Sequence, residues 1–358
     1  MTGRLSENWQ VIFMKSQKGK RVAVICLCLC VVVAAVIAVD LFLSDKEYQG
    51  STALMNTVVS LNVEGKSAEN TAKAVTDRIA ELENASLSRY RAASSVTKIN
   101  ADAGNFCEAD SLVLSLCQRC AEVSGKSEGA FNPLLGGVSD LWGFRTQNAR
   151  VPDAKELEQA LSAVRAKDME ISSTGIKIPD GTVLDFGAVG KGVACDEARK
   201  VLAKTDTERA VVSVGGSILL YGEGPSFTVG VRNPLGTASD CVGELSLGAT
   251  CVSTSGSYEN NFTLDGKTYH HILDPKTGYP VENNLLSVTV VCDDGFLSDA
   301  LSTACFVLGY DKSLSLLEKY GADAIFVFED KTVRTTQGIV ESFKLLSDDF
   351  TLLNGDVQ

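Results

Sequence analysis

Hydrophobic and polar positions follow two different periods along this chain. A helical period, with apolar residues every three or four positions, predicts helices over residues 67–85, 110–124, 153–166 and 196–204. Alternation or a short apolar run predicts strands over residues 54–63, 183–186, 210–214, 218–221, 227–231, 252–254, 262–264, 287–291 and 324–328. Because helices and strands alternate irregularly, the pattern predicts an α+β fold rather than a regular series of βαβ units.

The longest apolar run covers residues 22–39, which are 18 residues without a charged, amide or hydroxyl side chain. That length is close to the minimum for one bilayer span. Basic residues crowd its amino side and acidic residues follow it, which places residue 1 in the cytosol. A cleavable signal peptide is the alternative.

This interpretation divides the chain into four parts. We expect a cytosolic segment at 1–21, a transmembrane anchor at 22–43, a linker at 44–53 and one domain at 54–350. The domain would then lie on the extracytoplasmic side of the cell membrane, held there by a single N-terminal helix.

Composition and charge exclude several classes of protein. With 45% hydrophobic and 22% charged residues in 358, the chain is neither collagen-like, nor a coiled coil, nor largely disordered. The net charge is −12, and it becomes −15 for residues 47–358, because the first 46 residues hold six basic and three acidic side chains. A domain this acidic is poorly suited to bind nucleic acid. To bind any anionic ligand, it would need a local dipole or a metal ion that offsets the negative charge.

The eleven cysteines do not indicate a metal or disulfide framework. Cys117 and Cys120 form a single CxxC on a predicted helix, without the second CxxC or His pair that a zinc site needs. Several others stand inside apolar runs. We therefore predict buried thiols.

Residues 184–192 (LDFGAVGKG) form a small-residue turn between a predicted strand and a helix that begins near residues 189–192. The turn is not a phosphate-binding P-loop, because Asp185 and Gly192 stand where that motif requires Gly and Ser or Thr. Free N–H groups at the helix start, with few large side chains, still favour close approach of an anion. A purely structural turn is the alternative.

Two further clusters carry candidate chemistry. His270 and His271 are the chain's two histidines, and adjacent side chains in a strand face opposite ways, so at most one serves a given site. Asp299 and Thr303, with Ser298 as the expected N-cap, stand one turn apart on a predicted helix. Hard oxygen ligands suit Mg²⁺, although a capped core helix would have the same pattern.

In their residues and in their order along the chain, these clusters resemble the FAD:protein FMN transferases, the exported flavin transferases of the ApbE type. The resemblance spans nearly the whole chain after the apolar run. It rests on residues 55–57 (MNT), 90–91 (YR), 129–133 (GAFNP), 141–144 (LWGF), 184–192 (LDFGAVGKG), 214–216 (VGG), 254–256 (TSG), 271–278 (HILDPKTG) and 299–303 (DALST).

The resemblance implies a compact, T-fold-like α+β domain that binds flavin in a groove between two lobes. It also implies the reaction: FAD is the substrate, Mg²⁺ the cofactor, and FMN is transferred through a phosphoester bond to a Thr or Ser hydroxyl of a target flavoprotein, with release of AMP. A Mg²⁺-dependent FAD pyrophosphatase that makes FMN and AMP is one rival function. A non-catalytic, membrane-tethered flavin-binding protein is another.

Site residues follow from the same resemblance, position by position. Mg²⁺ would be held by Ala188, through its carbonyl oxygen, and by Asp299 and Thr303. The isoalloxazine ring or its ribityl chain would be surrounded by Met55, Tyr90, Ala130, Phe131 and Asn132. The adenosine side would be contacted by Asp185, Lys191 and Ile272. His271 would take the proton of the acceptor hydroxyl, unless an Asp does so.

Two positions depart from the family pattern. Asn132 and Ser217 stand where the family usually has Asp. The loss of two acids could alter flavin affinity or turnover, which is why the binding-only alternative stays open.

Overall fold

The computed structural model describes residues 29–33 and 47–353, except residues 145, 167 and 238. The chain divides into two units, Met1–Lys46 and Glu47–Gln358. Residues 29–33 are helical, and the rest of the predicted membrane anchor lies outside the described residues. Within the described ranges, no helix has the length and apolar character needed to cross a bilayer.

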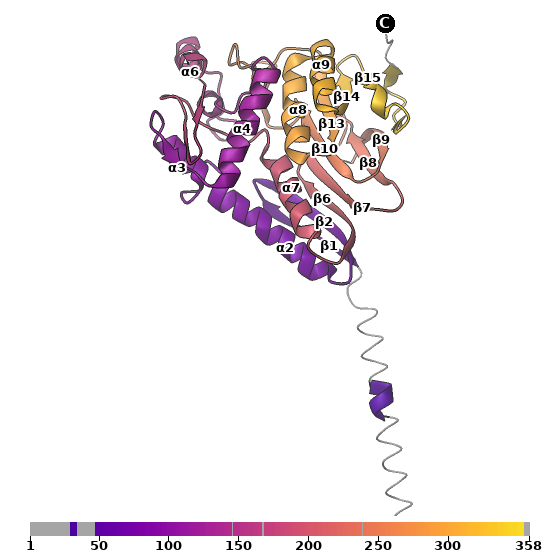
Figure 1. Ribbon diagram of the computed structural model, residues 1–358. Helices are drawn as coiled ribbons and strands as arrows, with labels where there is room; N and C mark the ends of the chain where they lie inside the picture. The colour runs from indigo at the N-terminus through magenta and orange to yellow at the C-terminus, as the bar shows by residue number, and fades with distance from the viewer. Residues whose placement is uncertain (1–28, 34–46, 145, 167, 238, 354–358) are drawn as a thin grey trace, which may run out of the picture. The chain divides into compact units, whose positions relative to one another are not determined.

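A nine-stranded sheet forms the centre of the second unit (Figure 1). All neighbouring strands are antiparallel except the last two, β15 and β17, which are parallel. In spatial order the strands are β1 (Glu47–Leu54), β2 (Thr57–Gly65), β6 (Thr207–Val214), β7 (Ser217–Gly222), β10 (Thr250–Gly256), β13 (Leu285–Cys292), β14 (Asp323–Phe328), β15 (Thr332–Thr335) and β17 (Thr351–Leu353).

The first strand of this sheet corrects the predicted linker. Residues 47–53 belong to β1, which forms a hairpin with β2. Met55 and Asn56 join the two strands with φ angles of 51° and 57°, as a two-residue hairpin turn requires. The sequence hides this strand because β1 lies at the sheet edge and exposes polar side chains. The domain therefore begins at Glu47 rather than at residue 54.

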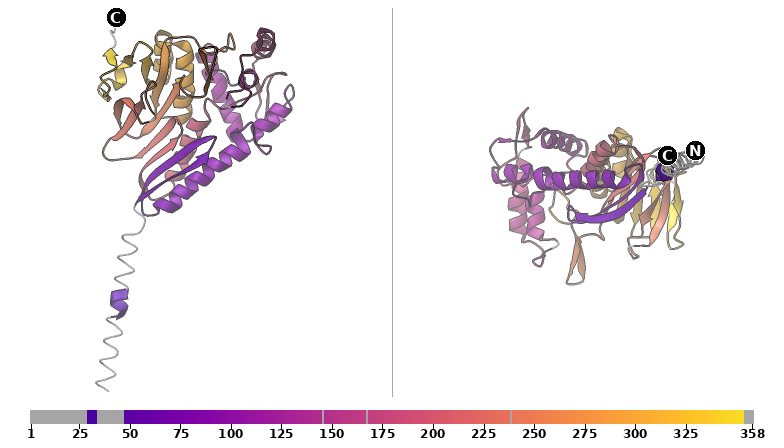
Figure 2. Two further views of the ribbon diagram at one scale, coloured as in Figure 1. Left: turned by 180° about the vertical axis from the view of Figure 1, so that it is seen from behind. Right: turned by 90° about the horizontal axis from the view of Figure 1, so that it is seen from below.

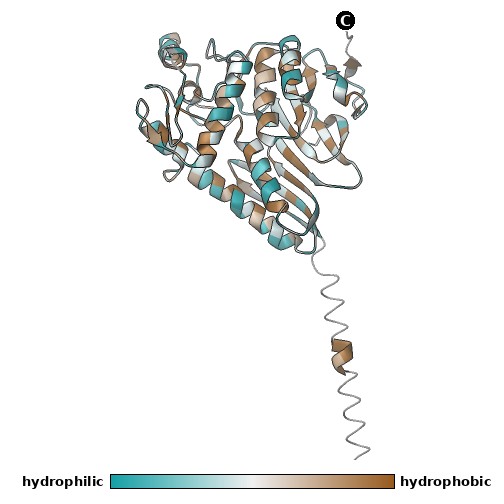
Figure 3. Ribbon diagram, in the orientation of Figure 1, coloured by the Kyte–Doolittle hydropathy of each residue, from teal (hydrophilic) through white to brown (hydrophobic). Residues whose placement is uncertain are grey.

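Helices cover one face of the sheet. The helices α2 (Ala68–Glu81), α7 (Gly190–Leu202) and α8 (Gly295–Leu308) pack there, and α9 (Tyr310–Tyr320) follows α8. Figure 3 shows many hydrophilic positions on α2, whereas α8 is mostly hydrophobic. This difference agrees with burial, since α8 is enclosed along most of its length.

A smaller sheet covers part of the opposite face, seen from behind in Figure 2. Its three strands are β16 (Phe343–Leu345), β9 (Cys241–Leu247) and β8 (Phe227–Arg232). Val231 and Leu245 of this sheet share a buried cluster with Ile325 and Val327 of β14. The central strands are therefore buried on both faces, which explains their nearly continuous apolar runs.

Most of the remaining elements lie between β2 and α7 in the sequence. The exceptions are the β11–β12 hairpin, which follows β10, and a short helix near the C-terminus. They are the π-helix η1 (Leu82–Leu87), α3 (Ser95–Ala101), β3 (Cys107–Glu108), α4 (Ser111–Lys126), α5 (Gly136–Trp142), α6 (Ala154–Ala166), β4 (Glu170–Ile171), β5 (Gly175–Lys177), β11 (Asn261–Leu264), β12 (Lys267–His270) and the 3₁₀ helix η2 (Gln337–Ile339).

Most predicted elements are confirmed, with two differences near the small-residue turn. The predicted strand at 183–186 is absent; only Val183 forms an isolated bridge, with Leu135. The helix predicted over 196–204 begins earlier, at Gly190, where the free N–H groups of the turn were expected.

The predicted burial of the CxxC thiols is confirmed. Cys117 and Cys120 are buried in α4, and burial raises the pKa of Cys117 to about 12, as expected for an unreactive thiol.

Candidate active site

Two glycines allow α7 and α8 to touch through their backbones. A Cβ atom on Gly192 would collide with the carbonyl oxygen of Gly295, and one on Gly295 would collide with the carbonyl oxygen of Gly192. Neither position therefore accepts a side chain. The contact brings the first turn of α7 against Asp299 on α8.

Asp299 lies on α8 at this crossing, and only 2% of it is exposed. Its Oδ2 accepts a hydrogen bond of 2.9 Å from the backbone N–H of Gly192. Its Oδ1 lies 3.6 Å from the ammonium nitrogen of Lys191. The positive end of a helix dipole and a lysine thus stabilise the carboxylate inside the protein.

The helix that carries Asp299 begins earlier than predicted. Asp294 is its N-cap, and the Asp294 side chain accepts a hydrogen bond from the N–H of Leu297. The assignment of Ser298 as N-cap is therefore wrong, because Ser298 lies within the helix and donates to the carbonyl of Gly295. Asp294 accepts from the N–H of Leu297, and Asp196 of α7 accepts from the N–H groups of Gly295 and Phe296, so the helix start is already capped one turn upstream of Ser298.

Thr303 lies one turn after Asp299, on the same face of α8. Its Oγ1 is 3.2 Å from the Oγ of Ser255, which comes from β10. Ala188 precedes α7 by two residues, at the end of the small-residue turn. Asp299 and Thr303 therefore lie on one face of α8, with Asp299 against the start of α7, and their role as metal ligands stays a prediction.

This donor set fits a small, hard cation. One carboxylate, one hydroxyl and a backbone carbonyl are oxygen donors, and Mg²⁺ takes few protein ligands while leaving other positions to water and substrate. No group of three or more His, Cys, Asp and Glu side chains suited to a metal occurs in the described part of the chain. A site built on a single acid would not form such a group.

Met55 is placed beside the start of α7 by the β1–β2 turn. Its N–H donates a 2.7 Å hydrogen bond to Oε2 of Glu83, and its Cε lies 3.4 Å from where a Cβ on Gly190 would stand. Arg91 binds the other oxygen of Glu83. Burial opposes ionisation, but these two hydrogen bonds hold the pKa of Glu83 below its usual value. Glu83 was not singled out in the sequence because its partner Met55 lies 28 positions away.

Asp185 has its oxygens engaged by the protein. Its Oδ1 accepts from the N–H of Gly187 at 2.8 Å, and its Oδ2 lies 2.9 Å from Nε of Arg89. The two terminal nitrogens of the Arg89 guanidinium donate to the two carboxylate oxygens of Asp140, both at 2.8 Å. With a side chain only 8% exposed, Arg89 ties the small-residue turn to α5. Although burial opposes it, the two acids raise the pKa of Arg89.

Replacement of Arg89 by Ala should destabilise the domain by about 2 kcal/mol, because it leaves two carboxylates close together without their cation. Urea denaturation measures this change. Arg150→Ala is the matched control, since Arg150 also forms a two-bond ion pair, with Glu156, but at an exposed position. Its effect should stay within about 0.5 kcal/mol. Equal losses in the two variants would contradict a tethering role for Arg89.

The residues predicted around the flavin ring differ in exposure. Tyr90 is 76% exposed, with the Arg89 guanidinium 4.6 Å from its ring centre. Phe131 is 2% exposed and belongs to the main hydrophobic core, together with Ile272. Because its ring is packed inside the protein, Phe131 presents no face for stacking on a flavin. Ala130 is also buried.

The two departures from the family pattern have clear local roles. The Oδ1 of Asn132 accepts a hydrogen bond from the N–H of Leu134 at 2.9 Å, a bond that an Asp would make equally well. Ser217 is buried, and its Oγ lies 3.0 Å from that of Ser253, which contacts Ser298 of α8. Both replacements are therefore accommodated without an unpaired charge.

His270 is held by structural contacts. Its Nδ1 accepts from the N–H of Ile272 at 3.3 Å, and its Nε2 lies 3.1 Å from the carbonyl oxygen of Val281. Its ring meets Phe306 of α8 edge-on, at 5.6 Å. Burial lowers the pKa of His270, which keeps the ring neutral with its proton on Nε2. The half-buried His271 therefore remains the candidate base.

The turn after His271 is closed by hydrogen bonds. Asp274 accepts from the N–H of Lys276 through Oδ1 and from the N–H of Gly278 through its carbonyl, both at 2.8 Å. Gly278 has a φ of +71°, and its carbonyl accepts from the indole N–H of Trp142 at 2.8 Å. The Asp-Pro turn thus fixes the chain that carries the histidines against α5.

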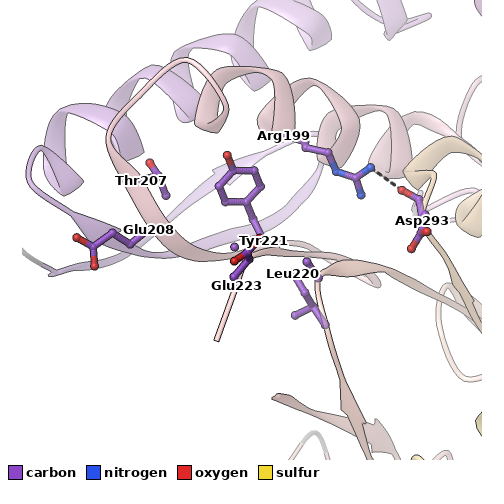
Figure 4. A pocket seen from close by; sticks show the side chains of 9 residues that line it. Arg199, Thr207, Glu208, Leu220, Tyr221, Glu223 and Asp293 are labelled. Atoms are coloured by element: carbon purple, nitrogen blue, oxygen red, sulfur yellow. Dashed lines mark hydrogen bonds between the residues drawn. The ribbon is translucent and has the colours of Figure 1, made fainter. Parts of the chain in front are cut away.

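A pocket of about 680 Å³ lies at the other end of α7 (Figure 4). Arg199 donates there to the carbonyl oxygen of Asp293 at 2.5 Å. None of the predicted site residues lines it; the lining consists of Arg199, Thr207, Glu208, Leu220, Tyr221, Gly222, Glu223, Ala249 and Asp293. The candidate active site therefore rests on the α7–α8 crossing rather than on this pocket.

Known proteins resemble this chain in sequence and in fold. A relative from Treponema pallidum, named FAD:protein FMN transferase, is 34% identical over 331 residues, which cover 86% of this chain and 91% of the relative. A relative of the same name from Klebsiella pneumoniae is 34% identical over 248 residues, 68% of this chain and 78% of the relative.

Solved structures agree. The crystal structure of an ApbE protein from Thermotoga maritima superposes with a TM-score of 0.77 at 30% identity, covering 83% of this chain and 99% of the other. The apo flavinyl transferase ApbE of Pseudomonas stutzeri gives 0.73 at 28% identity, with 84% and 97% covered. The ApbE family model matches residues 55–326, from the β1–β2 turn into β14. This chain therefore belongs to the ApbE family and has its mixed α/β fold.

Proposed function

We propose that this protein is a Mg²⁺-dependent FAD:protein FMN transferase. The observation that carries the proposal is that Asp299 and Thr303 lie on one face of α8, with Asp299 hydrogen-bonded to the first turn of α7. Relatives that cover most of the chain are named for this activity.

The proposed reaction exchanges one phosphorus–oxygen bond for another. The hydroxyl of a Thr or Ser on the target flavoprotein attacks the FMN phosphorus of FAD. A phosphoester bond forms, the pyrophosphate bond breaks, and AMP leaves with the electron pair of that bond. The proton of the acceptor hydroxyl passes to a base, for which we propose His271.

Asp299, Thr303 and the carbonyl of Ala188 would hold Mg²⁺. When bound, the ion offsets the charge of the FAD phosphates and polarises the phosphoryl group. This help matters because residues 47–358 carry a net charge of −15. Lys191 and the positive end of the α7 dipole supply further positive potential for the phosphates.

The flavin-side residues keep the roles proposed from the resemblance, with one change. Met55 beside Gly190 and the exposed Tyr90 are suited to contact the isoalloxazine ring or ribityl chain. Ala130, Phe131 and Asn132 would contribute through their backbone and the Asn132 amide, since the Phe131 ring is buried. We propose Asp185, Lys191 and Ile272 for the adenosine side, although the Ile272 side chain, like the Phe131 ring, is packed in the core.

The proposal is tested by incubating the full chain with FAD, Mg²⁺ and a flavoprotein domain that carries an acceptor Thr or Ser. We expect a fluorescent flavin band on the acceptor in a denaturing gel, and no band when EDTA replaces Mg²⁺. An acceptor labelled equally well in EDTA would contradict the metal-dependent reaction.

We also propose that one N-terminal helix anchors the protein in the cell membrane, with its domain on the extracytoplasmic side. The apolar run at 22–39 and its flanking charges support this location. We expect the protein to fractionate with membranes and its intact mass to include the N-terminal residues. A mature protein that starts near residue 39 would instead indicate a cleaved signal peptide.

A further inference from the structure

We infer that Ser255 is a positioning residue, which turns the hydroxyl of Thr303 so that its lone pairs face the Mg²⁺ site. This inference rests on the proposed function, in which Thr303 is a metal ligand. Its basis is the direction of three linked hydrogen bonds, of which one lies within α8 and two join β10 to α8.

The direction is set by Ser302. Its Oγ lies 2.8 Å from the backbone carbonyl oxygen of Asp299. A carbonyl oxygen can only accept, and a serine hydroxyl has one proton to donate. The proton of Ser302 is therefore used in this bond, and Ser302 can only accept from other partners.

The same logic passes through Ser255 to Thr303. The Oγ of Ser255 lies 2.8 Å from that of Ser302, so Ser255 must donate its single proton there. The Oγ of Ser255 is also 3.2 Å from Oγ1 of Thr303. Because Ser255 has no second proton, Thr303 is the donor of this bond.

A threonine hydroxyl that gives its proton to Ser255 keeps its lone pairs for a cation. Asp299, on the same face of α8, supplies the neighbouring charged ligand. Without Ser255, the Thr303 hydroxyl can rotate to donate to a carbonyl of the preceding turn, as helical threonines commonly do. Ser255 thus selects the rotamer and the proton direction that a metal ligand needs.

Burial strengthens this arrangement. Ser302 is fully buried, and Ser255 and Thr303 are partly enclosed between β10 and α8. Few water molecules can therefore replace the lost partner in a variant. Outer partners that orient metal ligands typically change metal affinity by about 10- to 100-fold when removed.

The test is Mn²⁺ binding to the purified full chain, without FAD or acceptor. Binding is measured as the decrease of the electron paramagnetic resonance signal of free Mn²⁺. Ser255→Ala should weaken Mn²⁺ binding about tenfold. Ser255→Thr keeps a hydroxyl and should recover most of the affinity. Thermal melting of each variant in metal-free buffer separates loss of affinity from loss of fold.

Thr254→Val is the matched control. The Thr254 hydroxyl pairs with that of Thr289 at 2.8 Å, and Thr254 faces away from α8 because adjacent strand residues point to opposite faces. It should leave Mn²⁺ affinity unchanged. Wild-type affinity in a folded Ser255→Ala variant, or an equal loss in Thr254→Val, would overturn the inference.

Asp299→Asn distinguishes this inference from the proposed function. If Asp299→Asn loses Mn²⁺ binding while Ser255→Ala keeps it, the role of Ser255 is wrong and the metal site stands. If both variants bind Mn²⁺ like the wild type, the metal site itself is wrong and the inference fails with it.

Discussion

Replacement of Asp299 by Asn is expected to reduce FMN transfer by about 10³-fold while the domain stays folded. A bound metal contributes several kcal/mol to charge stabilisation in the transition state, and each 1.4 kcal/mol corresponds to a factor of ten. Asn keeps the side-chain volume and an oxygen that can accept from the N–H of Gly192. Ala would leave that buried N–H without its acceptor, so Asn is the cleaner variant. Initial rates of acceptor labelling over a range of Mg²⁺ concentrations measure the effect.

Two controls define this result. Thr303→Val should show a smaller loss, because a neutral hydroxyl contributes less than a carboxylate to binding of a hard cation. Asp330→Asn removes an exposed acid in the β14–β15 turn, where Asp330 binds Thr332, and should leave transfer unchanged. Normal activity of Asp299→Asn at low Mg²⁺ would refute the assigned site.

His271→Ala should lose about 10²–10⁴-fold in transfer, the range typical for removal of a general base. Binding of FAD and of Mg²⁺ should be retained, because the variant removes a proton acceptor and no proposed ligand. Single-turnover labelling, with FAD affinity measured separately by fluorescence, distinguishes these effects.

His270→Ala is the comparison, and the structure changes what it should do. His270 binds the Val281 carbonyl and the Ile272 N–H and packs on Phe306, so its loss should lower the melting temperature. Transfer per folded molecule should remain close to that of the wild type. Equal catalytic losses in folded His270→Ala and His271→Ala would mean that this segment has only a structural role.

Local patterns predicted the parts of the site that lie within one element. The spacing of Asp299 and Thr303 is enough to place both on one face of a helix, and α8 has them there. The start of α7 could be inferred from the small residues before Lys191. In both cases the information lies within a few neighbouring residues.

Contacts between distant segments could not be predicted in this way. The hydrogen bond from Gly192 to Asp299 joins positions 107 residues apart, and it exists because two glycines permit the helices to touch. Arg89 meets Asp140 and Asp185 only once the fold is formed. The resemblance placed Phe131 near the flavin but did not show that its ring lies in the core.

The most direct test of the central claim is the ratio of AMP released to acceptor labelled, measured in one reaction of the full chain with FAD, Mg²⁺ and a competent acceptor. Chromatography quantifies AMP, and intact-protein mass spectrometry counts the FMN groups attached to the acceptor. The account predicts one AMP for each FMN attached through a Thr or Ser oxygen. AMP and free FMN without labelled acceptor would instead identify a pyrophosphatase, and bound FAD with neither product would identify a flavin-binding protein without catalysis.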